Sequence, residues 1–505
     1  MNDLNIVPKP VKIIIKEGKF LFNDNTAIFS NDKLKDLAIH LKEILSQATS
    51  FEFVVKEAIK KGNGKDNAIT LELSNLNFLK PESYILEVNS KIIELKAQSP
   101  SGIYYGIQTL KQLLPPEIEK KGDKLLELSV PCVKIEDYPR FPWRGFMLDE
   151  SRHFFGKELV KKILDIMSSL KLNVFHWHLT DDQGWRVEIK KYPPLTDVGS
   201  KREGTITKNR ELDGIPISGY YSQEDLKEII EYAARRYITV VPEVDVPGHT
   251  TALLASYPEL SCTGGPFEVS TRFGIHKEVL CVGKENVFNF VKDVLNEIIE
   301  VFPSEIIHLG GDEVPTRRWK KCFDCQSRIK TEGLQDEREL QFYFTNRVSN
   351  YLASRGKKLM GWNEILNNNL NIDAICQYWF GDFDLVLDDI KNGRKVVMSD
   401  RSAVYLDYSH SNLPLDKTYE YDPIPLELEE KYRKNILGIE ACLWTEFVSN
   451  SKQVERQSFP RLIAIAETGW SLKENKNFES FRNRVNSYLK RLNYRETDYT
   501  LSEIN

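Results

Sequence analysis

Between residues 144 and 443, strand-like segments alternate with segments that have the periodicity of amphipathic helices. The strand-like segments span residues 144–149, 173–179, 238–244, 305–309, 358–362, 373–379, 395–399 and 437–443. The helical segments lie near residues 157–170, 222–236, 284–301, 335–355, 384–392 and 453–467. Eight strands that mostly alternate with helices predict a (β/α)8 barrel. An open, doubly wound sheet is the alternative, but no phosphate-binding glycine fingerprint follows the first strand.

The residues before this region have a different pattern, which predicts a smaller α+β domain. Its strand-like segments are residues 11–15, 68–73, 84–88 and 92–97. Residues 61–65 are a loop of glycine, asparagine and lysine, and a helical segment at 101–114 stops at two prolines. A proline-containing link follows at 137–142. We therefore expect an N-terminal α+β domain at 1–136 and a barrel domain with C-terminal helices at 137–505.

Composition and charge argue against several classes of protein. The formal net charge is −5 and there is no long basic run, so we expect no nucleic-acid binding. No apolar stretch reaches the length that crosses a bilayer, which predicts no membrane span. The first residues lack a charged region followed by an apolar one, so we expect a cytosolic chain or one whose signal has been removed. The sequence predicts no particular oligomeric state.

The chain has seven cysteines, so at least one has no intrachain disulfide partner. Cys262 and Cys281 bracket a loop, and a disulfide between them is one possibility. Cys322 and Cys325 form a Cys-x-x-Cys motif, but no second motif of this kind completes a zinc site. We therefore predict a surface or structural role for Cys322 and Cys325 rather than metal or redox chemistry.

Polar and aromatic residues follow all eight predicted strands. Strands one to four are followed by Arg152, Asp181, His249, Asp312 and Glu313, and strands five to eight by Trp362, Trp379, Tyr405, Asp407, Trp444 and Glu446. Active sites of barrels assemble from the C-terminal ends of the strands. We therefore predict that these side chains converge on one pocket.

The pair Asp312 and Glu313 is the most informative of these stretches, because Gly310 and Gly311 precede it directly. Glycines let the backbone turn sharply and approach a ligand closely. Adjacent carboxylates repel each other, which pushes their pKa values apart and lets one site hold an acid and an anion. Taken alone, this stretch is equally typical of a loop with a helix N-cap. The polar residues at the other strand ends favour a functional site.

These motifs resemble those of glycoside hydrolase family 20, the β-N-acetylhexosaminidases, over nearly the whole chain. The barrel motifs are Arg-Gly-Phe-Met-Leu-Asp at 144–149, His-Trp-His-Leu-Thr-Asp-Asp-Gln at 176–183 and His-Leu-Gly-Gly-Asp-Glu at 308–313. Residues 84–88 and 102–110 are similar to the family's smaller domain. The resemblance implies a TIM barrel after an α+β domain, a carbohydrate substrate with terminal β-linked GlcNAc or GalNAc, and no cofactor or metal. The family is often exported, so it also implies a periplasmic or secreted location.

The resemblance implies exo-hydrolysis with retention, in which the substrate assists catalysis. The 2-acetamido oxygen of the sugar attacks its own anomeric carbon, and water opens the resulting oxazolinium-type intermediate. In this scheme Glu313 is the general acid for the leaving oxygen and then the base for water. Asp312 orients the acetamido N–H and stabilises the positive charge that develops there.

The aromatic residues are assigned by the same resemblance. Trp362, Trp379 and Trp444 match the box that encloses the acetamido methyl group and holds it in an attacking pose. A single tryptophan is more often part of a core, but three at strand ends favour the box. Tyr405 matches the residue that donates a hydrogen bond to the acetamido oxygen.

Three charged residues are implied to bind the sugar hydroxyls. Arg152 matches the residue that binds the 3- and 4-hydroxyls, and Asp407 and Glu446 match those that bind O4 and O6. In isolation, each is more typical of a surface ion pair or a solvated charge. The chain departs from the family pattern at Phe380 and Asn363, as well as in residues 409–412, and these differences bear on leaving-group preference more than on the chemistry.

Asp181 and His249 are expected to set the protonation state of Glu313 from a second layer. A lone histidine is more often structural, but His249 follows a family-like Asp-Val-Pro-Gly motif. His176 and His178 are expected to pack and form hydrogen bonds below the pocket.

Two other functions compete with the hydrolase interpretation. The ligands of a metal-dependent barrel hydrolase would be His176, His178, Asp181, Asp182, Asp245 and His249. Against this, the chain has only eight histidines and none lies in predicted strands five to eight. A catalytically inactive carbohydrate-binding homologue is the second alternative, and the intact pair of Asp312 and Glu313 argues against it.

Overall fold

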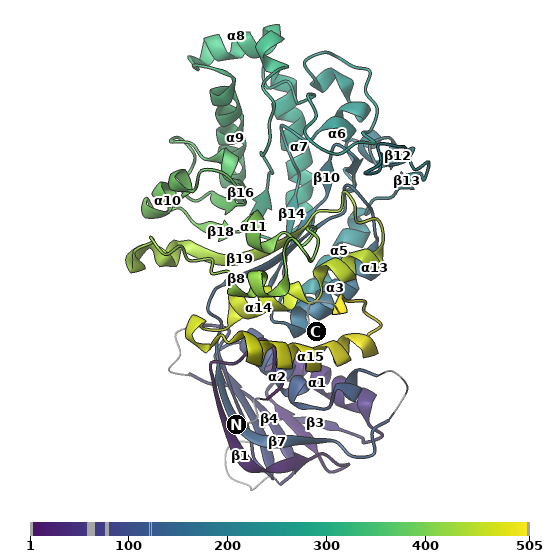
Figure 1. Cartoon of the computed structure of the whole chain (residues 1–505), viewed down its shortest axis with the longest axis vertical. Coiled ribbons are helices and arrows are strands. Elements are labelled where there is room, and N and C mark those ends of the chain that lie inside the picture. Colours follow the sequence, from purple (N-terminus) through teal and green to yellow (C-terminus); the bar gives the residue numbers. More distant parts are fainter. Residues whose placement is uncertain (1–3, 58–65, 76–79, 121, 123, 502–505) are drawn as a thin grey trace.

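The computed structural model describes residues 4–57, 66–75, 80–120, 122 and 124–501. A β-sheet domain lies at one end of the molecule and a larger barrel domain at the other, with the C-terminal helix α15 (Phe478–Tyr494) between them (Figure 1). The loop predicted at 61–65 lies outside the described residues. No helix within the described ranges is long and apolar enough to cross a membrane.

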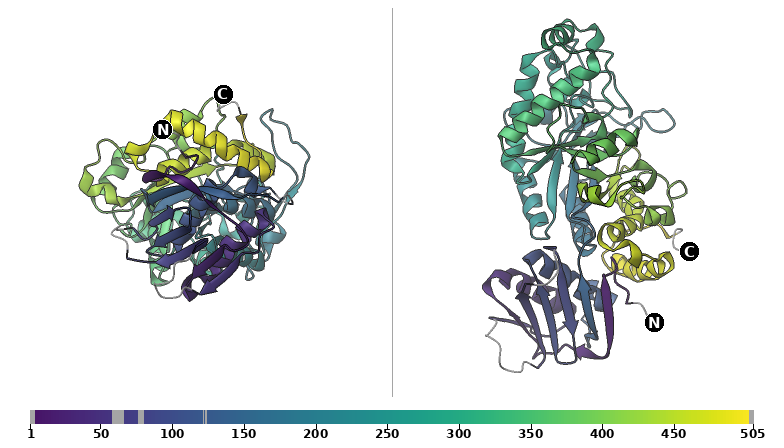
Figure 2. Two further views of the ribbon diagram at one scale, coloured as in Figure 1. Left: turned by 90° about the horizontal axis from the view of Figure 1, so that it is seen from below. Right: turned by 90° about the vertical axis from the view of Figure 1, so that its left-hand side faces the viewer.

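The N-terminal domain is a seven-stranded mixed sheet with two helices packed on one face (Figure 2). Its strand order is β1-β7-β5-β6-β4-β2-β3. The strands are β1 (Lys12–Leu21), β2 (Ala27–Ser30), β3 (Val54–Glu57), β4 (Ala68–Leu73), β5 (Tyr84–Val88), β6 (Ile92–Ala97) and β7 (Ser129–Asp137). The helices α1 (Lys35–Ala48) and α2 (Pro100–Leu113) bury apolar side chains against the sheet, so the core of this domain lies between the two layers.

The predicted strands at 68–73, 84–88 and 92–97 coincide with β4, β5 and β6. The predicted helix at 101–114 differs from α2 by one residue at each end, because Ser99 caps the helix by accepting a hydrogen bond from the backbone of Gly102. The strand predicted at 11–15 was too short. The second half of β1 is mostly exposed and carries charged residues, so its apolar alternation is weak.

Eight parallel strands close into a barrel in the order β8-β9-β14-β15-β16-β17-β18-β19, which confirms the predicted (β/α)8 fold. They are β8 (Trp143–Asp149), β9 (Val174–His178), β14 (Thr239–Glu243), β15 (Ile306–His308), β16 (Lys358–Trp362), β17 (Ile375–Tyr378), β18 (Val396–Met398) and β19 (Ile436–Leu443). Each predicted strand overlaps one of these, and the ends differ by at most two residues. The buried runs of β-branched and aromatic residues explain this agreement.

The main helices of the barrel are α3 (Lys157–Ser169), α5 (Gln223–Ala234), α7 (Glu285–Val301), α9 (Glu337–Ser354), α10 (Phe383–Lys391), α13 (Ser451–Ser458) and α14 (Arg461–Trp470). The single helix predicted at 453–467 was wrong, because the chain forms α13 and α14 instead. Pro460 interrupts the run: it has no backbone N–H to donate, and its ring conflicts with a carbonyl one turn earlier.

The remaining elements lie in the connections between the main strands and helices of both domains. The other helices are α4 (Pro194–Asp197), α6 (Thr251–Ser256), α8 (Phe323–Glu332), α11 (Arg401–Val404) and α12 (Leu415–Glu420). The short strands are β10 (Thr180–Asp181), β11 (Gly184–Trp185), β12 (Lys201–Arg202) and β13 (Ile217–Ser218). The 3-10 turns are η1 (Asp32–Leu34), η2 (Pro116–Glu119), η3 (Pro258–Leu260), η4 (Trp319–Lys321), η5 (Asn363–Ile365), η6 (Glu430–Asn435) and η7 (Lys473–Asn475).

A buried polar cluster joins the two domains at Asp137, the last residue of β7. Its carboxylate accepts hydrogen bonds from Tyr84 (2.5 Å), Lys171 (2.9 Å) and the indole of Trp470 (2.9 Å). All four side chains are buried. Removing one partner of such a pair leaves a buried charge without compensation, so this cluster fixes how the domains meet. The domain boundary predicted from the sequence, between residues 136 and 137, is next to this cluster.

Candidate active site

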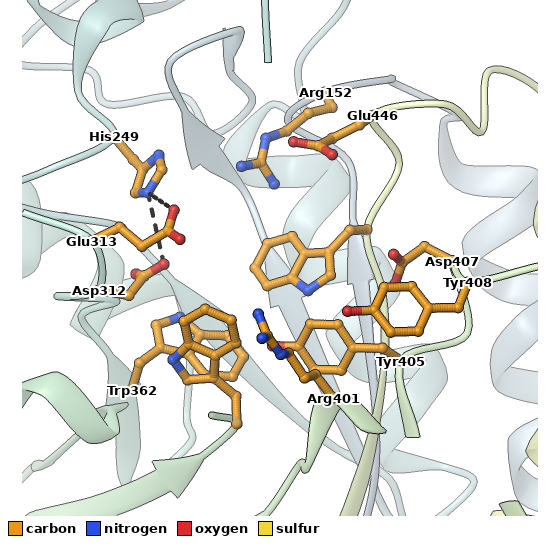
Figure 3. Close-up of a pocket in the computed structure, with 12 residues that line it drawn as sticks. Arg152, His249, Asp312, Glu313, Trp362, Arg401, Tyr405, Asp407, Tyr408 and Glu446 are labelled. Atoms are coloured by element: carbon orange, nitrogen blue, oxygen red, sulfur yellow. Dashed lines mark ion pairs between the residues drawn. The ribbon is translucent and has the colours of Figure 1, made fainter. Parts of the chain in front are cut away.

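A pocket opens at the C-terminal ends of the barrel strands (Figure 3). It is lined by Arg152, His249, Asp312, Glu313, Trp362, Trp379, Arg401, Tyr405, Asp407, Tyr408, Trp444 and Glu446. The structure thus brings together ten of the eleven site residues proposed from the sequence. The eleventh, Asp181, lies behind Arg152 and His249 and contacts both. Arg401 and Tyr408 were not anticipated.

The turn after β15 places two carboxylates in the pocket. Gly310 and Gly311 have φ angles of +67° and +86°, in the left-handed region. A Cβ atom on Gly310 would lie 1.9 Å from the carboxylate oxygen Oδ1 of Asp245, so the position requires glycine. Glu313 also has a positive φ, of +50°, which is uncommon for glutamate. Strained backbone of this kind persists where the surrounding structure enforces it, and it is concentrated at functional sites.

His249 faces both of these carboxylates. Its Nε2 atom lies 3.7 Å from Oδ2 of Asp312 and 3.6 Å from Oε2 of Glu313 (Figure 3). We call these three residues the acid side of the pocket. The imidazole is almost fully buried, so its charge interacts with both acids in surroundings of low dielectric constant.

Two buried aspartates hold His249 from behind. Its Nδ1 atom lies 3.3 Å from Oδ1 of Asp181 and 3.2 Å from Oδ2 of Asp182. Burial opposes the protonation of His249, but the charge of Asp181 and the hydrogen bonds to both aspartates raise the pKa of His249 well above its usual value. The imidazole is therefore a cation at neutral pH. The sequence analysis considered Asp182 only as a metal ligand in the competing interpretation, whereas the structure places it against His249.

Asp312 is held largely out of water. The pKa of Asp312 is raised to about 7: burial is the largest cause, the charge of His249 opposes the rise, and the charges of Glu364 and Glu243 add to it. The Oδ1 atom of Asp312 has no hydrogen-bond partner among the described residues. A buried acceptor without a partner is costly, so this atom is well placed to accept a hydrogen bond from a bound molecule.

A second buried network lies below the pocket and centres on Glu243. The barrel register places Glu243 of β14 opposite His178 of β9 and His308 of β15. Its carboxylate lies 2.5 Å from Nδ1 of His178, 3.1 Å from Nε2 of His176 and 3.0 Å from Nδ1 of His308. It also accepts a hydrogen bond from the indole of Trp362 (3.0 Å). His176 and His178 therefore lie beneath the pocket floor, and Glu243 is a hub that sequence reasoning missed.

The opposite side of the pocket is an aromatic wall formed by Trp362, Trp379, Trp444 and Tyr405. The rings of Trp362 and Trp444 have centroids 5.7 Å apart, and Trp379 stacks on Tyr405 at 6.2 Å with an interplanar angle of 15°. Trp362 is only 1% exposed, whereas Trp379 and Trp444 are half-buried. Offset rings at these separations gain stability from packing, so the wall is rigid and apolar.

Glu364 fixes the edge of this wall. Its two carboxylate oxygens accept hydrogen bonds from the indole of Trp379 at 3.2 and 3.0 Å. Asn363 accepts a hydrogen bond from the backbone N–H of Trp379 (3.1 Å) and donates to the carbonyl of Phe380 (3.0 Å). Asn363 therefore fills a positioning role at one of the places where the chain departs from the family pattern.

Charged residues line the rim of the pocket. Arg152 is fixed by Asp149 (3.2 Å) and Asp181 (2.8 Å), and its guanidinium lies 5.0 Å from the ring of Trp444. Burial raises the pKa of Asp407 to about 7, and burial likewise raises the pKa of Glu446. These carboxyl groups are poised to bind hydroxyl groups, because each can act as a donor or an acceptor as its protonation changes.

Arg401, which sequence reasoning missed, follows β18 as the first residue of the short helix α11. Its guanidinium lies 3.3 Å from the ring centroid of Phe380 and 5.7 Å from that of Trp379. Phe380 is 48% exposed and supports Arg401 from outside the pocket. The apolar residue at position 380 is thus explained by a cation–π contact. The sequence did contain a signal: Arg401 follows the strand next to the one that Trp379 follows, so the two side chains could be expected to lie close together.

Several buried histidine–carboxylate groups are close enough to hold a metal ion. They are His176, Glu243 and His308; His178, Asp181 and Asp245; Asp181, Asp182 and His249; and Asp245, His249 and Asp312. In each group a histidine already forms at least one ion pair or hydrogen bond with a carboxylate of the same group. A buried network of ion pairs and hydrogen bonds accounts for much of this arrangement. Burial and the charge of Asp312 raise the pKa of Asp245 well above its usual value, which favours its neutral form.

Comparison with known families supports the arrangement of both domains. The family described as "Glycosyl hydrolase family 20, catalytic domain" matches residues 141–473, and "Glycosyl hydrolase family 20, domain 2" matches residues 3–138. A β-hexosaminidase of Porphyromonas gingivalis is 38% identical over 98% of this chain and 64% of its own length. This chain therefore spans less than two thirds of that relative. A β-hexosaminidase of Akkermansia muciniphila is 34% identical over 89% of this chain and 93% of its own length.

Solved structures have the same architecture. One is a family 20 exo-β-N-acetylglucosaminidase from Vibrio harveyi in complex with N-acetylglucosamine, with a TM-score of 0.85. It is 30% identical to this chain, and the match covers 98% of this chain and 78% of that one.

Proposed function

The chain belongs to glycoside hydrolase family 20, and from this we propose that it is a retaining exo-β-N-acetylhexosaminidase. It removes terminal β-linked GlcNAc or GalNAc from glycans, and the acetamido group of the substrate acts as the nucleophile. One observation carries the proposal: a pair of adjacent acids beside a buried histidine cation faces a wall of three tryptophans across one pocket.

The aromatic wall supports participation by the acetamido group. A methyl group packed among Trp362, Trp379 and Trp444 cannot swing into solvent, so the acetamido oxygen is held near the anomeric carbon. Tyr405 is buried and lies between Trp379 and Trp444, where its hydroxyl can donate a hydrogen bond to that oxygen. Holding a nucleophile in a near-attack position converts a bimolecular step into a unimolecular one and contributes several kcal/mol, up to about 7–11 kcal/mol in favourable intramolecular systems.

Asp312 supports the same step from the other side. Its free Oδ1 atom is suited to accept a hydrogen bond from the acetamido N–H. As the oxygen attacks, positive charge develops on the acetamido group, and a nearby carboxylate stabilises that charge. For this role Asp312 must be ionised, so substrate binding has to lower its raised pKa. The hydrogen bond to the N–H and the developing cation both act in that direction.

Glu313 is the general acid for the departing oxygen and then the base that activates water. It is more exposed than Asp312, with a side chain 33% accessible, so it can reach a leaving group at the mouth of the pocket. His249 lies 3.6 Å from its carboxylate, and Asp181 holds His249 from behind. Through these contacts the carboxylate of Glu313 interacts with the buried charges of His249 and Asp181, which solvent does not screen.

The rim residues support recognition of a terminal sugar. Arg152 is held by two carboxylates, so its guanidinium presents remaining donors in a fixed direction to the 3- and 4-hydroxyls. Asp407 and Glu446 bind O4 and O6 in this proposal. The Oδ1 atom of Asp407 has no hydrogen-bond partner in the part of the chain that the structure describes, which leaves it available to a hydroxyl. Groups that surround the non-reducing end favour exo-cleavage.

The V. harveyi structure contains N-acetylglucosamine, which favours a GlcNAc-type ligand for the same fold. We test the proposal with nitrophenyl glycosides that differ at C2 and C4. Hydrolysis of the β-GlcNAc and β-GalNAc substrates is expected, with no turnover of the β-glucoside, which has no acetamido group. Equal turnover of the glucoside would refute participation by the acetamido group. Binding of the β-GlcNAc substrate without turnover would instead favour the inactive carbohydrate-binding alternative.

A thiazoline analogue of the cyclic intermediate sharpens this test. It should bind at least about 10²-fold more tightly than free N-acetylglucosamine, because it resembles the transition state more than the product does. A thiazoline no tighter than the product would contradict the proposed mechanism even if the glycoside panel succeeded.

A further inference from the structure

Four cysteines meet outside the pocket lining, and they come from distant parts of the chain. They are Cys262, Cys281, Cys322 and Cys325, whose sulfur atoms all lie within 4.8 Å of one another. The separation is 3.8 Å between Cys262 and Cys325, 3.5 Å between Cys281 and Cys322, and 3.6 Å between Cys281 and Cys325. We call this group the cysteine cluster.

The sequence-based expectation that no second pair accompanies Cys322 and Cys325 was wrong. That expectation relied on Cys-x-x-Cys spacing, and the second pair has none. Cys262 and Cys281 are brought together by tertiary structure: Ser261 and Leu280 form an antiparallel bridge, and the backbone N–H of Cys281 donates to the carbonyl of Leu260 (2.8 Å).

Helix α8 supplies the other two sulfurs. Cys322 is its N-cap residue and Cys325 lies in its first turn, where the helix dipole stabilises negative charge on a thiolate. The two halves of the cysteine cluster are in close backbone contact. A Cβ atom on Gly283 would lie 2.3 Å from the backbone nitrogen of Cys325, so only glycine allows this approach.

The arrangement of the sulfurs fits a tetrahedral ion better than two disulfides. With zinc–sulfur bonds of about 2.3 Å, neighbouring sulfurs of a tetrahedral site are about 3.8 Å apart. Two disulfides would require the sulfurs to separate into two pairs. Instead, Cys281 is close to both Cys322 and Cys325, and Cys325 is also close to Cys262.

We propose that the cysteine cluster binds one zinc ion as a structural site. Four thiolates in tetrahedral geometry form a closed coordination shell, which is typical of structural rather than catalytic zinc. On binding, the thiols release their protons to solvent and no electron is transferred. Three of the four cysteines are buried, which protects the site. Lys284 donates to the carbonyls of Glu259 and Ser261 and brings a positive charge next to the thiolates.

The zinc ion would join the two loops that carry the acid side of the pocket. Cys262 and Cys281 lie in the loop that follows His249, and Cys322 and Cys325 lie in the loop that follows Glu313. The two loops also meet where the indole of Trp319 donates to the carbonyl of Leu280 (2.8 Å). Within the first loop, the backbone N–H of Leu280 donates to the carbonyl of Pro247 (3.0 Å). The ion thus acts as a crosslink behind His249 and Glu313.

Metal content of the purified wild-type chain tests the proposal without any variant. The protein is produced in zinc-containing medium and purified without chelators or oxidants, and its metals are measured by mass spectrometry of the elements. We expect one zinc per chain. After denaturation without reductant, alkylation should modify all seven cysteines. A chain without zinc whose mass shows two disulfides would overturn the proposal, as would a chain that contains iron in place of zinc.

Two single variants locate the site. Cys322→Ser should lower the zinc content from one equivalent to near zero. Cys132→Ser, which changes a buried thiol of the N-terminal sheet outside the cysteine cluster, should keep one equivalent. Should Cys322→Ser fail to fold, zinc released from the native wild-type protein by a mercurial reagent and trapped by a chromogenic chelator gives the same stoichiometry. Full zinc retention in Cys322→Ser would contradict the assignment.

The consequence for the loops is measured by hydrogen exchange. Removal of zinc should increase exchange in residues 258–283 and 314–333 while the N-terminal sheet keeps its protection, because only the first two segments lose a crosslink. Unchanged exchange in both loops after zinc removal would refute the crosslinking role. Zinc content and exchange are read without substrate, so their outcome is independent of whether the proposed glycosidase activity is found.

Discussion

The acid side and the aromatic wall of the pocket are built in different ways. On the acid side every charged group has a buried partner: His249 lies between Asp312 and Glu313 in front and Asp181 behind. The aromatic wall is formed by packed rings, and hydrogen bonds from the indoles of Trp362 and Trp379 to Glu243 and Glu364 fix it at its edges. The acid side is therefore sensitive to the charge of residues that never touch a ligand, whereas the wall is sensitive to volume and shape.

Glu313→Gln should have the largest effect on activity. The amide cannot protonate the leaving oxygen, so kcat for a substrate with a poor leaving group should fall by about 10²–10⁴-fold. With a dinitrophenyl leaving group, which departs without protonation, the first step should be nearly unaffected. Steady-state and pre-steady-state rates on both substrates measure this difference.

Glu300→Gln is a matched control, because Glu300 lies exposed on α7, outside the residues that line the pocket. Its activity should equal that of the wild type. An equal loss for both leaving groups in Glu313→Gln would place Glu313 outside the proton-transfer step.

Asp312→Asn should reduce kcat by about 10²–10³-fold, because an amide cannot stabilise the positive charge that develops on the acetamido group. Unlike the loss in Glu313→Gln, this loss should be similar for good and poor leaving groups. The dependence on the leaving group therefore shows which acid protonates the leaving oxygen and which assists the attack, even where the two variants lose similar activity. A strong dependence of the Asp312→Asn loss on the leaving group would indicate that the two roles are reversed.

Trp379→Ala tests the wall by removing volume. It should reduce kcat/KM by about 10–10²-fold, because the acetamido group gains freedom to leave its attacking position. Its affinity for a thiazoline should fall, while the acid side keeps its pH dependence. Phe380→Ala is the neighbouring control: its ring supports Arg401 and does not line the pocket, so its effect should be only a few-fold. A shifted pH profile in Trp379→Ala would show that the aromatic wall also affects the ionisation of the acid side, which contradicts the proposed difference between them.

The two sides also differ in how far the sequence predicted them. Trp362 and Trp379 end buried apolar strands, so their position at the mouth of the barrel follows from strand periodicity. Glu243 ends a predicted strand as well, but its role as a hub for three histidines depends on the barrel register, which places His178 and His308 on the two neighbouring strands. Pairwise register between strands far apart in the chain is not encoded in local periodicity.

The cysteine cluster and Arg401 were missed for related reasons. Cys262 and Cys325 are 63 residues apart, and only the loop conformation brings their sulfurs together. Arg401 sits on a four-residue helix after β18, too short to leave a periodic signal. The barrel, the two-domain order and the pocket residues at strand ends were accessible from local pattern and family motifs, while contacts between loops were not.

Asp181→Asn probes the acid side from its second layer. Without this carboxylate the pKa of His249 falls, because the imidazolium loses its main source of stabilisation. A neutral His249 no longer opposes the raised pKa of Asp312, which is about 7 in the free protein. Since Asp312 acts as a carboxylate, kcat/KM should fall as the pH drops below about 7 in the wild type. In Asp181→Asn this acid limb should move to higher pH.

Asp197→Asn, which changes an exposed aspartate on α4, should leave the limb in place. A limb that stays unchanged in Asp181→Asn would show that Asp181 serves to hold Arg152 by an ion pair and does not control the charge of His249.

The smallest expected effect is on stability, and it opposes the effect on activity. The folded-state pKa of Asp312 is raised, so its contribution to stability is fully present below the unfolded pKa of 3.8 and is lost as pH rises through about 7. Above pH 7 the wild type must keep a buried carboxylate, and Asp312→Asn removes that cost. The variant should therefore be more stable than the wild type at pH 8 by roughly 1–3 kcal/mol, and equal to it near pH 4. Denaturant unfolding at the two pH values measures this difference. A variant less stable than the wild type at pH 8 would show that His249 more than offsets the burial of Asp312, and that the acid side is stabilising as well as functional.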